Sequence, residues 1–197
     1  MELILATGNN HKAEELQEIM KDHRIIIPRD LGIDFDFEET GTTFFENSYG
    51  KAMHLFKQTG KPVIADDSGL CVPALDGAPG IYSARYGAAP GEPDLESPER
   101  NALLLSQMEG IENREAFFVC SMVLIMGEYR FFAAQETVEG EIIRESRGVG
   151  GFGYDPLFYL PHLNKTIAEL PAEEKNLLSH RGLAGKKMAA IIDTINI

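Results

Sequence analysis

The stretch Val63-Ile64-Ala65-Asp66-Asp67-Ser68-Gly69 places two neighbouring carboxylates directly after a short apolar run. Residues 62–65 are typical of a buried strand, and turn-forming residues follow them. We therefore expect Asp66 and Asp67 to emerge at the carboxyl edge of a sheet, where open α/β folds bind ligands. Adjacent carboxylates in a partly desolvated cleft repel each other, and a divalent cation removes that repulsion. The alternative is a plain Asx turn after the strand.

The composition is that of one folded domain with a strongly acidic balance. The chain has 197 residues and a formal net charge of −13 at pH 7. This length suits one well-buried domain, so we expect a single domain over residues 1–197. The charge argues against nucleic acid or an anionic membrane as a partner, because both attract basic surfaces. A small polyanionic substrate is compatible with it if basic groups cluster locally beside a metal.

We expect no targeting or membrane signal in this sequence. Residues 1–7 include an acidic residue and only a very short apolar run, unlike a signal peptide. The longest apolar stretch, residues 117–126, is far shorter than the about 20 residues that span a bilayer. Cys71 and Cys120 lie far apart without a CxxC pattern, which is typical of reduced cytosolic thiols. We therefore expect a cytoplasmic protein.

Strand-like and helix-like patterns alternate early in the chain and give way to strands later, which predicts an α/β fold with a mixed sheet. Strands are expected at residues 3–6 and 24–27, with a helix carrying Leu16, Ile19 and Met20 between them. Thr42 is expected to cap a helix that ends near Gly60. A loop is expected at 87–96 and a helix from Ser97-Pro98 to residue 108. Two strands at 116–126 and 129–138 are expected to form a hairpin around Gly127-Glu128. The last helix is expected to carry Met188, Ile191, Ile192 and Ile195 on one face.

The turn after the first expected strand is a candidate phosphate cradle. It reads Thr7-Gly8-Asn9-Asn10-His11-Lys12 and joins a strand end to a helix start. Glycine and asparagine tolerate unusual backbone angles, so several N–H groups can converge on one anion, while the helix dipole and Lys12 add positive charge. The turn lacks the GxxxxGK[ST] sequence of P-loop proteins. The alternative is an ordinary strand-to-helix turn.

The helix expected after Thr42 carries a polar stripe of Asn47, Gly50, Lys51 and His54 at helical spacing. Such a stripe is usually solvated. However, Lys51 follows the acidic segment Glu38-Glu39-Thr40-Gly41, so a carboxylate and an ammonium group could enter one cleft.

The glycine-rich segment 148–156 formally satisfies GxGxxG, but a strand is expected after it rather than a helix, so we reject dinucleotide binding. The segment presents Phe152, Tyr154 and Asp155, which suit stacking on a purine and hydrogen bonding to its edge. A turn whose aromatic rings fill the core is the alternative.

Later in the chain, His180 and Arg181 fall in the first turn of the last helix, where cations are unfavourable unless an anion or acceptor is present.

Seven segments in chain order carry a family resemblance. They are Thr7-Gly8-Asn9 with Lys12; Glu39-Thr40-Gly41 with Thr43-Phe44 and Glu46-Asn47; Lys51-Ala52; 65–70; 77–85; 150–156; and Ser179-His180-Arg181. With them the chain resembles the inosine triphosphate pyrophosphatase family. The resemblance implies an elongated α/β fold of two lobes around a long mixed sheet with a cleft between them, Mg²⁺ dependence with Mn²⁺ as a possible substitute, and a homodimer. It also implies conversion of the purine nucleotides ITP, dITP and XTP to the monophosphate and pyrophosphate.

The resemblance also implies a role for each motif. The triphosphate is expected at Thr7, Gly8, Asn9, Asn10, His11 and Lys12, with Lys51 assisting, and Ser68 is expected to touch the substrate. The base is expected at Phe152, Gly153, Tyr154, Asp155, Lys175, His180 and Arg181. The catalytic residues are expected to be Asp67, as proton acceptor, with Lys12 and Lys51. Metal ligands are expected to be Glu39 and Asp67, with Glu38 an open alternative to Glu39. His180 and Arg181 are candidate donors to position 6 of the purine, where an amino group would leave the donor unpaired.

Two alternatives come from other classes. A non-catalytic nucleotide-binding sensor would have no need of Glu39, Asp66 and Asp67 together. A Maf-like pyrophosphatase would act on modified pyrimidines, and the base loop with Ser179-His180-Arg181 argues against it. The sequence does not rank ITP, dITP and XTP.

Overall fold

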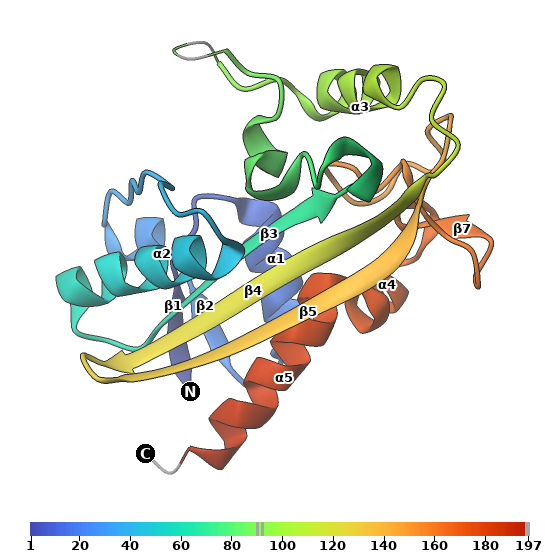
Figure 1. Cartoon of the computed structure of the whole chain (residues 1–197). Coiled ribbons are helices and arrows are strands. Elements are labelled where there is room, and N and C mark those ends of the chain that lie inside the picture. The colour runs from blue at the N-terminus through green and yellow to red at the C-terminus, as the bar shows by residue number, and fades with distance from the viewer. Residues whose placement is uncertain (90, 92, 196–197) are drawn as a thin grey trace. The chain divides into compact units, whose positions relative to one another are not determined.

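The computed structural model describes residues 1–89, 91 and 93–195, which contain seven strands in one mixed sheet (Figure 1). The strands are β1 Glu2–Leu5, β2 Arg24–Ile26, β3 Val63–Cys71, β4 Glu115–Gly127, β5 Arg130–Ile142, β6 Phe158–Leu160 and β7 Lys165–Thr166, in the order β2-β1-β3-β4-β5-β6-β7. β1 pairs in parallel with β2 and β3, whereas β6 pairs antiparallel with β5 and β7. The predicted α/β class with a mixed sheet is confirmed. The elongated two-lobed shape and the cleft stay predictions.

The chain divides into two compact units. Unit 1 consists of Met1–Ser68, Cys120–Glu136 and His180–Ile197, and unit 2 of Gly69–Val119 and Thr137–Ser179. Strands β3, β4 and β5 each begin in one unit and end in the other. The single domain expected over residues 1–197 stays a prediction.

In unit 1, α1 (Asn10–Ile19) and α5 (His180–Thr194) pack on one face of the strands and α2 (Phe44–Thr59) packs on the other. Alternating strand residues separate these faces. One apolar cluster joins Leu3, Leu5, Ile64, Met122 and Leu124 to Leu16 of α1 and to Met188 and Ile192 of α5, and a second joins Ile4, Val63, Ala65, Val123 and Ile125 to Leu55 of α2. The predicted apolar face of the last helix is therefore confirmed.

The helix α2 begins one residue later than predicted. Its N-cap is Thr43, whose Oγ1 accepts from the Glu46 N–H at 3.1 Å, while the Glu46 carboxylate accepts from the Thr43 N–H at 3.1 Å. This capping box needs a spacing of three residues, which Thr43 meets. Thr42 instead donates both its N–H and its hydroxyl to Glu46. The helix ends at the left-handed Gly60, as predicted.

The strand β3 does not end at Ala65. It continues through Asp66 and Asp67 to Cys71, so the prediction of a turn at the two acids is wrong. The strand can continue because the buried carboxylates have polar partners, which offset the cost of removing them from water. The acids still lie beyond the last residue that pairs with β1, because the Leu5–Ile64 pair is the final one of that parallel ladder.

Unit 2 contains α3 (Ser97–Gln107), α4 (Ala172–Leu178) and a core around Phe118, Leu157 and Phe158. The N-cap of α3 is Glu96 rather than Ser97, because the Glu96 N–H donates to the Glu99 carboxylate at 2.9 Å. The predicted loop at 87–96 has neither helix nor strand in its described residues, and positions 90 and 92 of that prediction lie outside them.

The remaining predictions concern the hairpin, the cysteines and the membrane. β4 and β5 are neighbours joined at Glu128-Tyr129, so the hairpin is confirmed with its turn one residue later than expected. Cys71 and Cys120 are free thiols, both buried. Across the described part of the chain, no helix combines the length and apolar character needed to cross a bilayer.

Candidate functional site

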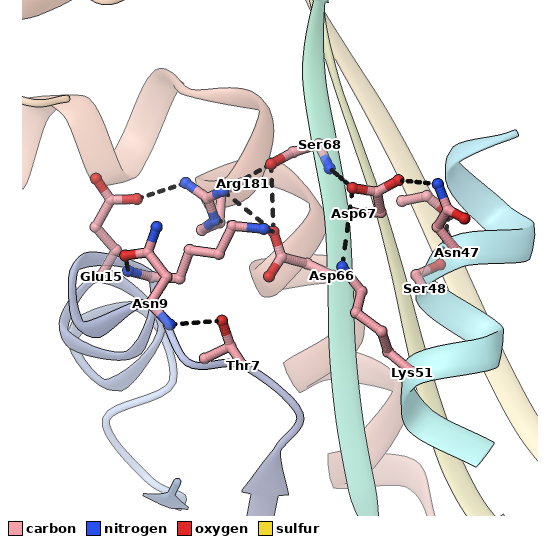
Figure 2. Close-up of polar contacts among 12 residues, drawn as sticks. Thr7, Asn9, Glu15, Asn47, Ser48, Lys51, Asp66, Asp67, Ser68 and Arg181 are labelled. Atoms are coloured by element: carbon pink, nitrogen blue, oxygen red, sulfur yellow. Dashed lines mark hydrogen bonds and ion pairs between the residues drawn. The ribbon is translucent and has the colours of Figure 1, made fainter. Parts of the chain in front are cut away.

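Two consecutive acids of β3, Asp66 and Asp67, form the centre of the candidate site in unit 1. Their exposed fractions are 3% and 5%. Side chains alternate along a strand, so the two carboxylates point in different directions. Figure 2 shows Asp66 directed toward Arg181 and Asp67 directed toward α2. The site therefore has one half on each side of β3.

Cations surround Asp66. Its Oδ2 lies 3.1 Å from Lys12 Nζ and 3.1 Å from Arg181 Nη2, and Arg181 Nε donates to the same oxygen at 3.3 Å. Burial alone would raise the pKa of Asp66, but Lys12, Arg181 and Lys51 hold that pKa well below its usual range. Asp66 is therefore ionised at neutral pH.

Arg181 forms hydrogen bonds with three side chains, those of Glu15, Asp66 and Ser68. Its Nη1 donates to Glu15 Oε2 at 2.7 Å, and its Nη2 donates to Ser68 Oγ at 2.8 Å as well as to Asp66. Burial lowers the pKa of Arg181, and Asp66 and Glu15 raise it by more, so the guanidinium stays charged. The two hydrogen bonds to Asp66 Oδ2 and the ion pair with Glu15 fix the plane of the guanidinium.

The predicted phosphate turn overlaps the start of α1, because Asn10, His11 and Lys12 already lie in the helix, and it is exposed from Gly8 to His11. Asn9 is the N-cap, and its Oδ1 accepts from the N–H groups of His11 and Lys12 at 2.9 and 3.3 Å. Thr7 Oγ1 accepts from the Asn9 N–H at 3.1 Å. The turn thus places the positive end of the helix dipole at an exposed part of unit 1, while the Lys12 ammonium group lies beside the buried Asp66 carboxylate.

Asp67 is held by α2 and by its own strand. Asn47 Nδ2 donates to Asp67 Oδ2 at 3.0 Å, and the Ser68 N–H donates to Oδ1 at 3.0 Å. Lys51 Nζ lies 3.8 Å from Oδ1 and also donates to the Glu39 carboxylate. Burial raises the pKa of Asp67; Lys51 opposes this, the Glu39 charge adds to it, and the pKa remains raised.

Glu39 and Asp67 are two carboxylates that fit part of a site for a hard divalent cation. Both face one ammonium group, and the Glu39 charge disfavours ionisation of Asp67, a penalty that a cation would relieve. Mg²⁺ is usually held by one or two carboxylates together with phosphate oxygens and water. The described residues contain no group of three or more His, Cys, Asp or Glu side chains placed to hold a metal, so the substrate would have to complete such a site. Glu39 is half-buried whereas Glu38 is exposed, which favours Glu39 as the ligand.

The polar stripe of α2 is not a solvated face. Asn47 and Lys51 are only 1% and 8% exposed and both contact the acidic groups described above. His54, at the far end of the stripe, is exposed. The interpretation of the stripe as a charge mixture in solvent is therefore wrong for its first half.

In unit 2, Asp155 organises the glycine-rich loop. Its Oδ2 accepts from the Phe152 N–H at 2.8 Å and from Lys175 Nζ of α4 at 2.8 Å. The same Lys175 nitrogen lies 4.8 Å from the centre of the Phe152 ring. Phe152, Asp155 and Lys175 are thus one contiguous group.

Tyr154 does not present its ring to a ligand. It is 4% exposed, packs in the core of unit 2, and donates its hydroxyl to the Ser83 carbonyl at 3.0 Å. Burial raises the pKa of this phenol. Of the two aromatic faces expected from the loop, Tyr154 fills the core and Phe152 remains partly exposed.

The structure therefore groups the predicted residues in two sets. Unit 1 holds Thr7, Gly8, Asn9, Asn10, His11, Lys12, Glu39, Lys51, Asp67, Ser68, His180 and Arg181, and unit 2 holds Phe152, Gly153, Tyr154, Asp155 and Lys175. Two residues of the unit 1 network, Glu15 and Asn47, were given no role from the sequence, and Asp66 was named only as one of the paired acids. Asn47 stood in a motif that was noted, and Glu15 could have been found by its position one helical turn after Lys12.

Comparison with known proteins gives consistent matches over almost the whole chain. A sequence model of the Ham1 family matches residues 3–191. A protein of Treponema denticola named dITP/XTP pyrophosphatase is 50% identical over 184 residues, which cover 93% of this chain and 94% of that protein. The solved structure of a HAM1 protein from Coxiella burnetii has a TM-score of 0.89 at 40% identity and covers 99% of this chain and 100% of its own. The Ham1 protein of Staphylococcus aureus has a TM-score of 0.86 at 39% identity, with 98% of each chain covered.

Proposed function

Because the chain belongs to the Ham1 family, we propose that it is a nucleoside-triphosphate pyrophosphatase that converts dITP, ITP and XTP to the monophosphate and pyrophosphate. The name dITP/XTP pyrophosphatase of its relatives supports the reaction and the substrates dITP and XTP. The observation that carries the proposal is the pair of buried acids on β3, each matched with a lysine: Asp66 with Lys12 and Asp67 with Lys51. A protein that only binds nucleotides would not need this second, proton-accepting acid.

Lys12 and Lys51 act on the phosphates in this proposal. Water attacks the α-phosphorus and pyrophosphate leaves, through a loose transition state with negative charge on its peripheral oxygens. Catalysis of such a step rests on positioned cations more than on covalent chemistry. Both ammonium groups are held by carboxylates in unit 1, so their positions are set before substrate binds.

Asp67 accepts the proton of the attacking water. A carboxylate with a raised pKa is a better base than an ordinary one at neutral pH. In the metal-free protein, burial and Glu39 supply that shift, while Asn47 Nδ2 and the Ser68 N–H fix the orientation of the carboxylate. Asp66, with its low pKa, stays ionised and holds Lys12 and Arg181.

We propose Mg²⁺ as the cofactor, with Mn²⁺ as a substitute, held by Glu39 and Asp67 and completed by phosphate oxygens and water. When bound, the metal neutralises phosphate charge and orients the triphosphate. The carboxylate pair around Lys51 supports this assignment.

Base recognition is assigned to Phe152 and Asp155 with Lys175. The partly exposed Phe152 ring offers a stacking surface, and the buried Asp155–Lys175 pair sets the loop that carries it. Gly153 and Tyr154 shape that loop. The assignment of His180 and Arg181 as donors to position 6 of the purine stays a prediction, to which the contacts of Arg181 add a role in holding Asp66.

A panel of nucleoside triphosphates with Mg²⁺ tests the function. We expect XTP, ITP and dITP to be hydrolysed with much higher kcat/KM than ATP and GTP, and chromatography to show the monophosphate and pyrophosphate. Formation of the diphosphate and orthophosphate would contradict the reaction. The Asp67→Asn protein is the matched control for contaminating phosphatases.

Assembly and location are expected from the sequence. A homodimer is expected from the family resemblance, and light scattering at micromolar concentration would test it. A cytoplasmic location and the absence of nucleic-acid and membrane partners stay predictions from the sequence.

A further inference from the structure

Gly50 lies in the middle of α2, where the Phe37 ring fills the space beside it. A Cβ built on Gly50 would lie 2.7 Å from Phe37 Cζ and 3.4 Å from Cε1, and the three atoms nearest to that position all belong to this ring. The first of these distances is well inside van der Waals contact. Glycine also weakens a helix interior relative to alanine. A close packing contact is therefore the reason for glycine at this position.

The ring of Phe37 is fixed by a second contact with α2. Its centroid lies 5.6 Å from that of His54, one turn further along the helix. Phe37 is half-buried, although it belongs to a segment without helix or strand. The contact of the Phe37 ring with Gly50 therefore holds the segment around Phe37 against α2.

A second attachment lies four residues later in the same segment. The Gly41 N–H donates to Asn47 Oδ1 at 2.8 Å, and a Cβ on Gly41 would lie 2.6 Å from that oxygen. Phe37 and Gly41 are two residues before and two residues after Glu39. Glu39 is therefore held between two attachments to one helix.

The two attachments direct the Glu39 carboxylate to Lys51, the residue directly after Gly50. Lys51 in turn faces Asp67. We propose that Gly50 is a positioning residue: its missing side chain admits Phe37 and so holds the Glu39 carboxylate beside Lys51 and Asp67, where these two carboxylates would hold a metal. This inference rests on the proposed function and adds to it the residue that places the first metal carboxylate.

The test is a double-mutant cycle between residues 50 and 37. Gly50→Ala adds one methyl group, which must displace the ring or the segment by about an ångström, and a shift of that size can cost about a hundredfold in rate. We expect Gly50→Ala to lower kcat/KM for XTP by about tenfold to a hundredfold and to raise the Mg²⁺ concentration for half-maximal turnover. In the Phe37→Ala background the same change should alter both quantities by less than about twofold, because the ring is gone.

Phe35 supplies the matched control. Its ring also faces His54, at 6.1 Å between centroids, but it lies four residues before Glu39. In the Phe35→Ala background, Gly50→Ala should be as harmful as in the wild type. An effect of Gly50→Ala that is equal in the Phe37→Ala and wild-type backgrounds would overturn the proposal.

Two readouts do not depend on turnover. Urea unfolding should show that Gly50→Ala lowers the midpoint in the wild type and raises it in the Phe37→Ala background, where only the helix propensity of alanine acts. Mn²⁺ affinity, measured by EPR with an α,β-methylene analogue of XTP, should be weaker for Gly50→Ala by about tenfold. Wild-type Mn²⁺ affinity in Gly50→Ala refutes the positioning role, whereas a wild type that binds Mn²⁺ but hydrolyses no purine nucleotide refutes the proposed function alone.

Discussion

Asp66 and Asp67 are consecutive residues of β3 whose carboxyl groups have pKa shifts in opposite directions. Both are buried, and burial alone would raise the pKa of each. Two close cations, Lys12 and Arg181, outweigh burial at Asp66, whereas the Glu39 charge partly cancels Lys51 at Asp67. In active sites, neighbouring carboxyl groups with pKa values shifted apart typically have different acid–base roles. This difference supports the proposed roles, with Asp66 as the permanent anion and Asp67 as the proton acceptor.

Asp66→Asn should destabilise the fold. The change leaves Arg181 and Lys12 without their shared buried carboxylate, and loss of one partner of a buried ion pair costs about 3–5 kcal/mol. Urea unfolding at pH 7 measures the free energy. Asp22→Asn, at an exposed position after α1, is the control and should change it by less than about 0.5 kcal/mol. A loss at Asp66 no larger than that of the control would mean that the ion-pair network contributes nothing to the fold.

The same network predicts acid sensitivity. The folded-state pKa of Asp66 lies below its unfolded value of about 3.9, so the native state binds this proton less readily than the unfolded state. The stability from this group is complete well above that pH and is lost as the pH falls below about 4, by up to about 1.4 kcal/mol per pH unit. Unfolding followed between pH 6 and 3 should therefore show a shallower acid limb in Asp66→Asn than in the wild type. Parallel limbs would contradict the low pKa.

Asp67→Asn, unlike Asp66→Asn, should reduce turnover strongly and leave the stability of the fold almost unchanged. A carboxyl group with a raised pKa is destabilising when ionised, so its replacement by the amide should leave the free energy of unfolding unchanged or slightly higher. Turnover of XTP should fall by about 10²–10⁴-fold, since the amide cannot accept the proton and is a poor ligand for a cation. Single-turnover kinetics and urea unfolding on the same preparation give both numbers. Near-normal turnover would remove Asp67 from the mechanism.

The sequence predicted the elements of the fold better than the details of the site. Hydrophobic periodicity located α1, α2 and α5 because a helix with one buried face has apolar residues at regular helical spacing in the sequence. It ended β3 at Ala65, because a pair of acids is typical of a turn and the cations that permit their burial come from residues far away in sequence, Lys12 and Arg181. Long-range ion pairs of this kind leave no local pattern.

Two questions that the sequence left open depend on contacts of this kind. Asn47 and Lys51 have the residue types of a solvated stripe, and only the partners Gly41, Asp67 and Glu39 make them buried. Tyr154 has the type of a stacking residue, and its contact with the Ser83 carbonyl, 71 residues away, places it in the core. Residue type thus identified which side chains matter, and tertiary contacts decided what each one does.

The loop that carries Phe152 allows a matched pair of glycine substitutions. Gly151 and Gly153 both have positive φ, at +71° and +63°, so alanine at either position carries a similar backbone cost of about 1–2 kcal/mol. They differ in what a Cβ would meet: on Gly151 it would lie 2.1 Å from Asp155 Oδ2, and on Gly153 nothing lies within 4 Å. Gly151→Ala therefore displaces the carboxylate that accepts from the Phe152 N–H and from Lys175, and Gly153→Ala leaves it in place.

If the Asp155–Lys175 pair sets the base site, Gly151→Ala should raise the KM for XTP at least about tenfold more than Gly153→Ala does, with a smaller difference in kcat. Thermal unfolding of both proteins separates this effect from general destabilisation, because the backbone cost is shared. An equal rise in KM for the two variants would mean that the backbone conformation of the loop, rather than the Asp155 carboxylate, determines base binding. A rise confined to Gly151→Ala would place base recognition at Phe152, Asp155 and Lys175, as their contacts indicate.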